Sequence, residues 1–96
     1  MSAHVRRVVD LLFALQGHVM HGLGNKQVAS LVGQLEATTL RDLQFLAELG
    51  ITERIPGHEK QWRLTPRICQ LALALQHEFA REQQRVDDTI NRYTRN

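Results

Sequence analysis

Apolar residues recur at helical spacing at the start of the chain. An inward stripe is formed by Val5, Val8, Val9, Leu12 and Leu15. These residues fall three or four positions apart, so we expect an amphipathic helix over residues 3–16. Gly17 ends the pattern, and residues 18–24, which hold two glycines, are typical of a connecting loop.

A short second helix is predicted to begin near Asn25 and to end at Gly33. The Asn25 side chain suits an N-cap, because its oxygen can accept a hydrogen bond from a free backbone amide at a helix start. Gly33 suits the left-handed residue that often closes a helix. The apolar side of this helix comprises Val28, Ala29, Leu31 and Val32.

A three-residue turn, 34–36, leads into a third helix expected over residues 37–49. Leu40, Leu43 and Leu46, with Leu49 as a further candidate, recur every three residues and are expected to point inward, and Gly50 closes the helix. Two helices joined by so short a turn are typical of a helix-turn-helix.

The pattern changes after Gly50 from helical to alternating, which is typical of strands. Segments 51–55 and 61–64 flank the turn-forming segment 56–60, which begins with Pro-Gly, and together they predict a β-hairpin. Trp62 is expected to face the core beneath this hairpin rather than to stack on a base. Arg63 is expected on the opposite side of the strand.

A fourth helix is expected from Thr65-Pro66 to about residue 93. Proline suits the first helical position, where its missing N–H costs no hydrogen bond, and Thr65 offers a capping hydroxyl. The first half is expected to close the core through Ile68, Leu71, Ala72 and Leu75. The second half carries an expected dimer interface of Phe79, Val86, Ile90 and Tyr93, interrupted by Gln76 and Gln83. The thin stripe favours an antiparallel or short interface, or a site for another protein.

This order of elements predicts a mainly α fold with a small β-hairpin, namely a winged helix-turn-helix followed by a long C-terminal helix. We expect residues 1–75 to form the winged helix-turn-helix domain. Residues 76–96 are expected to serve dimerisation or partner binding. A length of 96 residues allows one small core, whose marginal size would be helped by a second subunit.

The charge distribution adds a candidate partner. The net charge is only +2, but ten of the twelve basic residues are Arg, whose planar fork suits phosphates and guanine edges. Residues 1–48 carry four basic and four acidic groups, whereas segment 54–67 carries four basic residues and one acid, Glu59. The surplus of positive charge therefore falls on the predicted β-hairpin, which we call the wing, and on the residues that flank it.

The outer side of the third helix holds the candidate base-reading residues, Thr38, Thr39, Arg41, Asp42 and Gln44. Arg41 is the leading candidate for guanine, and Asp42 either orients Arg41 or accepts from a cytosine amine. The alternative is that a threonine only caps the helix and that Arg41 makes a surface ion pair.

The candidate contacts to the DNA backbone are Lys26, Arg54, His58, Lys60, Arg63 and Arg67. Each phosphate contact releases counterions, so affinity is expected to fall steeply with salt. The alternative is a solvated charged hairpin that protects the edge of the sheet.

Two segments resemble the winged-helix domain of the IclR transcriptional regulators. They are Arg41-Asp42-Leu43-Gln44-Phe45-Leu46-Ala47-Glu48-Leu49-Gly50-Ile51 and Trp62-Arg63-Leu64-Thr65-Pro66-Arg67-Ile68. Val8-Val9-Asp10-Leu11-Leu12 is similar to the opening helix of the family. The resemblance covers about residues 5–75, and MarR-type and other winged-helix families share part of it. It implies a DNA-binding regulator. IclR-type regulators add a large effector-binding domain where this chain continues into a helix, so we expect no sensing by such a domain, as in short regulators of phage or mobile-element type.

Other chemistry finds little support in the sequence. His18 and His21 have no carboxylate or thiolate beside them, so we expect neither a metal site nor a cofactor, and no catalytic constellation is present. The single Cys69 excludes an internal disulfide and is expected in the core or an interface. Without a long apolar run, we expect no membrane span and a cytoplasmic setting.

Two functions compete on these observations. The first is a dimeric, sequence-specific regulator bound to a palindromic double-stranded DNA site. The second is a winged-helix module, of phage or accessory type, that binds another protein instead of DNA. The near-neutral first half of the chain and the acids Asp42 and Glu48 favour the second.

Overall fold

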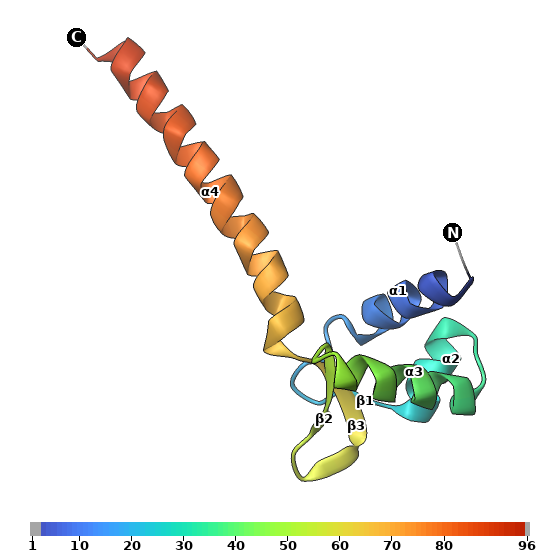
Figure 1. Ribbon diagram of the computed structural model, residues 1–96. Helices are drawn as coiled ribbons and strands as arrows, with labels where there is room; N and C mark the ends of the chain where they lie inside the picture. Colours follow the sequence, from blue (N-terminus) through green and yellow to red (C-terminus); the bar gives the residue numbers. More distant parts are fainter. Residues whose placement is uncertain (1–2, 96) are drawn as a thin grey trace.

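The computed structural model describes residues 3–95, which form four helices and a three-stranded antiparallel sheet (Figure 1). In chain order the elements are α1 (Ala3–Leu15), β1 (Leu23–Gly24), α2 (Asn25–Val32), α3 (Glu36–Glu48), β2 (Thr52–Ile55), β3 (His58–Leu64) and α4 (Pro66–Thr94). The strand order is β1-β3-β2. The expected mainly α fold with a small hairpin and a long C-terminal helix is confirmed.

The core lies where α1, α2 and α3 meet one side of the sheet. Its buried apolar side chains are Leu11, Leu15, Leu23, Val28, Leu43, Leu46 and Trp62. The inward face predicted for α1 is wrong at three positions. It omits Leu11, which is 1% exposed, and it includes Val5 and Val9, which are 49% and 41% exposed. The packed face of α1 is instead set by Leu11 and Leu15, one helical turn apart.

The connector before α2 contains a short strand that the sequence pattern did not predict. Leu23 of β1 pairs with Trp62 of β3, so the wing is a three-stranded sheet rather than a hairpin alone. Gly22 makes this approach possible, because its φ is +68° and a Cβ there would lie 2.6 Å from the Trp62 carbonyl oxygen. A two-residue strand is too short to leave a periodic signal.

The N-cap of α2 is Gly24, and the prediction that Asn25 fills this position is wrong. The Gly24 N–H donates to Gln27 Oε1 at 2.8 Å, so the backbone amide of the N-cap is hydrogen-bonded by a side chain of the first turn. The Asn25 amide instead donates to the Glu36 carbonyl oxygen at 3.0 Å and ties α2 to the first turn of α3. The expected end at Gly33 is confirmed by its φ of +69°.

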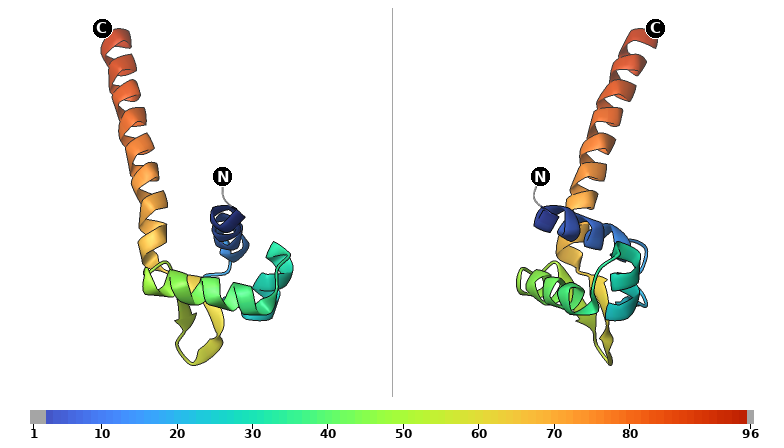
Figure 2. Two further views of the ribbon diagram at one scale, coloured as in Figure 1. Left: turned by 45° about the vertical axis from the view of Figure 1, so that its right-hand side comes forward. Right: turned by 90° about the vertical axis from the view of Figure 1, so that its right-hand side faces the viewer.

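Helix α4 points away from the compact part of the molecule, as Figures 1 and 2 show. None of its described residues is buried, and Leu71 and Leu75 are 64% and 49% exposed, so the expectation that its first half closes the core is wrong. The axis diverges from the domain directly after Pro66, which leaves the later turns without a surface to cover. Cys69 is exposed and is not a core residue.

The start of α4 is fixed to the end of α3. Thr65 is the N-cap and Pro66 the first helical residue, as expected, but the Thr65 hydroxyl does not cap the helix. It donates to the Gly50 carbonyl oxygen at 2.5 Å, while the Thr65 N–H donates to the Ile51 carbonyl oxygen at 2.9 Å. Arg67 donates to the Leu49 carbonyl oxygen at 2.9 Å. This joint defines the direction in which α4 leaves.

Candidate nucleic-acid interface

Helix α3 has one buried face and one open face. Thr39, Leu43 and Leu46 are buried against the core. At about 100° per residue, Arg41 and Gln44 lie on the opposite side of the helix, and both are exposed. Within the described part of the chain, neither side chain makes a hydrogen bond or ion pair. Their polar groups are therefore free to meet a ligand.

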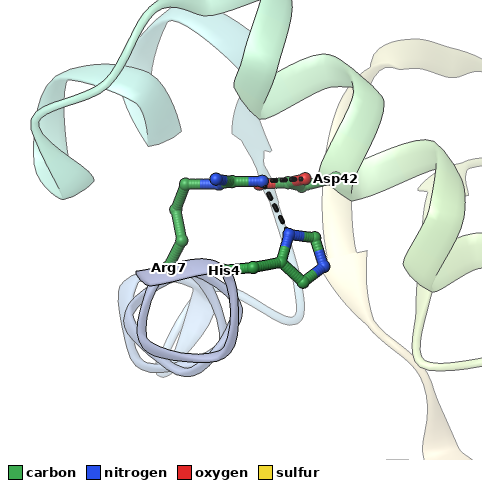
Figure 3. Close-up of polar contacts among 3 residues, drawn as sticks. All are labelled: His4, Arg7 and Asp42. Atoms are coloured by element: carbon green, nitrogen blue, oxygen red, sulfur yellow. Dashed lines mark hydrogen bonds and ion pairs between the residues drawn. The ribbon is translucent and has the colours of Figure 1, made fainter. Parts of the chain in front are cut away.

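Asp42 forms the one contact between charged side chains that joins α1 to α3 among residues 3–95. Arg7 donates from Nε to Asp42 Oδ2 at 2.8 Å and from Nη2 to Asp42 Oδ1 at 3.2 Å (Figure 3). The same Nη2 lies 2.9 Å from His4 Nδ1. The hydrogen bond to Asp42 raises the pKa of the Arg7 guanidinium above its ordinary value, so this cation stays charged.

Burial removes two residues from the expected base-reading set. Thr39 is fully buried, and Asp42 is 7% exposed and already paired with Arg7, so neither side chain can reach a base edge. Thr38 is half-buried at the rim of the open face. The base-reading set that remains accessible is Thr38, Arg41 and Gln44.

A concave surface lies between α1 and α3, beside the open face. It is lined by His4, Arg7, Thr38, Arg41, Asp42 and Phe45. Phe45 is 52% exposed and was absent from the expected set. Phe45 comes four residues after Arg41 and seven after Thr38, which places all three on successive turns of one helix side, and this spacing is the signal that could have identified it.

Three of the expected backbone contacts gather around a second hollow, between α2, α3 and the sheet. Lys26 comes from the first turn of α2, Arg54 from β2 and Lys60 from β3. The Arg54 guanidinium lies 4.4 Å above the centre of the Trp62 ring and donates to the Glu59 carbonyl oxygen at 2.7 Å. Trp62 is 2% exposed, which confirms its expected place in the core. Lys26 and Lys60 remain exposed, so positive charge from three elements borders one surface.

Two other residues expected to contact the DNA backbone already bind groups of the protein. Arg63 pairs at 2.7 Å with Glu53, the residue opposite it in the β2–β3 ladder. Arg67 belongs to the joint with α3. Both therefore have structural partners within the chain, and their expected contacts with phosphates stay predictions. His58 is exposed at the tip of the hairpin.

The residues expected at a dimer interface are all exposed on α4. Phe79, Val86, Ile90 and Tyr93 are 69%, 51%, 53% and 80% exposed. Among residues 3–95, no three potential metal ligands gather, and no helix is both long and apolar enough to cross a membrane. Comparison with known protein families gives no match to this chain, and no curated protein matches it either.

Proposed function

We propose that this chain is a sequence-specific, double-stranded DNA-binding regulator of transcription, with α3 in the major groove and the wing on the backbone. The observation that carries this proposal is the open face of α3, where Arg41 and Gln44 are exposed and have no partner within the described chain. An Arg offers two parallel donors to guanine and a Gln offers a donor and an acceptor to adenine.

The second hollow supports the same orientation. A helix in the major groove brings the flanking hairpin against neighbouring phosphates. Lys26, Arg54 and Lys60 surround the hollow next to α3, so they supply positive charge on the side where the strand of DNA passes. The small net charge of +2 is no obstacle, because phosphate contacts depend on local charge.

A single winged helix contacts few base pairs, so we propose that two copies act together on an inverted repeat. The resemblance of segments 41–51 and 62–68 to IclR regulators is a second support. In this proposal the exposed α4 supplies the contact with the second subunit.

Selection from a random duplex pool at low salt tests the proposal. We expect enrichment of an inverted repeat, bound by the purified chain with a steep negative dependence of affinity on salt. The Arg41→Ala variant is expected to enrich a degenerate site from the same pool. Absence of duplex binding at low salt, by a chain that is folded by circular dichroism, contradicts the proposal.

A protein-binding module is the second candidate, and exposed apolar side chains near the turn favour it. Leu31 of α2 is 63% exposed, Leu35 between α2 and α3 is 76% exposed, and Phe45 of α3 is 52% exposed. Apolar side chains of this size are more common at protein interfaces than at DNA interfaces. Two results together select this function. The chain forms a stoichiometric complex with another protein and the Leu35→Ser variant does not, and the chain does not bind duplex DNA.

A further inference from the structure

Six apolar side chains form a narrow stripe along α4. They are Ala72, Leu75, Phe79, Val86, Ile90 and Tyr93, and every one is exposed. At about 100° per residue, all six fall within roughly 60° of the helix circumference. A stripe this narrow and this long is the pattern of a helix that packs against another helix.

The spacing of these six exposed residues fits a second copy of the chain as the partner, while the half-buried Ile68, on the same side one turn before Ala72, lines an apolar groove at the base of α4. The intervals between consecutive members are three, four, seven, four and three residues, a series that reads the same in both directions. We propose that α4 pairs antiparallel with α4 of a second copy of this chain, centred between Glu82 and Gln83. In this register Ala72 lies opposite the partner's Tyr93, Leu75 opposite the partner's Ile90 and Phe79 opposite the partner's Val86. Each apolar residue of the stripe meets another.

The charges beside the stripe fit the same register. Glu78, Glu82 and Arg85 lie along one flank, and Arg85 already pairs with Glu82 at 3.2 Å within its own helix. Antiparallel packing brings this flank against its own copy, which places Arg85 between the partner's Glu78 and the partner's Glu82. Two opposite charges then face each cation, and the symmetry of the dimer repeats the contact.

The stripe continues into an apolar groove at the base of α4. Leu12 and Phe13 of α1, Leu64 of β3 and Ile68 and Ala72 of α4 line this groove. Because Ala72 faces the partner's Tyr93, that ring reaches the groove and packs beside Phe13. Phe13 and Tyr93 are 71% and 80% exposed in the single chain, so the dimer removes both from water.

This inference rests on the proposed function only in that both use two copies. The pairing itself needs no DNA. A dimer without duplex binding therefore leaves the inference standing and removes the proposed function. Duplex binding by a monomer removes the inference and the use of two copies, and leaves DNA binding by α3 standing.

Disulfide crosslinking of the full chain in a Cys69→Ser background tests the register. The antiparallel pairing places Ala72 of the two copies about 21 residues, or roughly 32 Å, apart, which no disulfide spans. We therefore expect Ala72→Cys alone and Tyr93→Cys alone to stay unlinked, and their mixture to form a covalent heterodimer. Gln83→Cys alone, at the centre, links to its own copy. Self-linking of Ala72→Cys identifies a parallel pair and overturns the register.

Mass measurement by sedimentation tests the dimer and its charges. We expect the unmodified chain to be a dimer and Val86→Lys to be a monomer with unchanged helix content. Arg85→Glu is expected to raise the dimer dissociation constant at least tenfold, and adding Glu78→Arg and Glu82→Arg to it is expected to restore pairing. A monomeric unmodified chain at all concentrations, or a restored variant as weak as Arg85→Glu, overturns the proposal.

Discussion

Arg7 and Asp42 lie 35 positions apart in the chain and are joined by two hydrogen bonds, of 2.8 and 3.2 Å. This contact fastens α1 to the face of α3 next to Arg41. It also matches the negative charge of Asp42 with a cation beside the surface that is proposed to meet phosphates. The pair thus positions α3 and would reduce its repulsion of DNA in the proposed complex.

Arg7→Ala is expected to lower the midpoint of thermal unfolding, because it leaves the buried Asp42 carboxylate without its cation. Asp42→Asn retains hydrogen-bonding capacity and is expected to cost less. The double variant Arg7→Ala/Asp42→Ala is expected to lose less stability than the two alanine variants summed. Arg6→Ala, at an exposed neighbouring position, is the matched control. Additive losses would show that the pair is not coupled.

Arg41→Ala and Lys60→Ala are expected to weaken DNA binding in different ways. Loss of Arg41 costs about 1–3 kcal/mol at one base pair and relaxes the preference there. Loss of Lys60 lowers affinity for all duplexes alike and makes the logarithmic salt slope shallower by about 1. Fluorescence anisotropy on the selected site and on single-base variants measures both. Identical specificity profiles for the two variants would refute this division of roles.

Thr39→Val is expected to leave sequence preference unchanged and to stabilise the fold. The Thr39 hydroxyl is buried without a hydrogen-bond partner among the described residues, and valine has nearly the same shape. Replacing an unsatisfied buried hydroxyl with a methyl group should raise the free energy of unfolding by about 1 kcal/mol. Urea denaturation followed by Trp62 fluorescence provides the measurement. A loss of base specificity in Thr39→Val would return Thr39 to the binding face.

Gly22→Ala is expected to destabilise the protein more than Gly17→Ala. Both glycines have positive φ, +68° and +82°, so both substitutions carry a backbone cost of about 1–2 kcal/mol. Only at Gly22 would the new methyl group collide, with the Trp62 carbonyl oxygen at 2.6 Å and Ile55 Cδ1 at 2.7 Å. The difference between the two denaturation midpoints measures the clash. Equal losses would indicate that β1 moves without cost.

The elements could be predicted from the sequence because their signals are local. Gly33, Pro66 and the alternation around Trp62 depend on the backbone conformation of a few neighbouring residues, and all three lie where the pattern indicated. Asn25 shows the limit of such reasoning. A cap residue is a preference, and here Gln27 satisfies the helix start and frees Asn25 to bond to Glu36.

The site could be predicted only in part, because accessibility depends on distant segments. Arg41 and Gln44 follow from helical periodicity alone. The pairing of Asp42 with Arg7 joins two helices with no local sign, and that of Arg63 with Glu53 needs the register of β2 and β3. The exposure of Leu71 and Leu75 depends on the direction in which α4 leaves, which the hydrogen bonds of Thr65 set.

That joint has a mechanical consequence. Helix α4 runs over 29 residues, about 43 Å at roughly 1.5 Å per residue, from an anchor made by Thr65 and Arg67 on the last turn of α3. It is a lever whose short end is α3, the helix proposed to bind DNA. A rotation of about 10° at the anchor moves the far tip by about 7 Å, close to two base-pair steps of about 3.4 Å. If two copies bind DNA as proposed, a small repacking around Gly50 would therefore change the distance between the two DNA sites that they span.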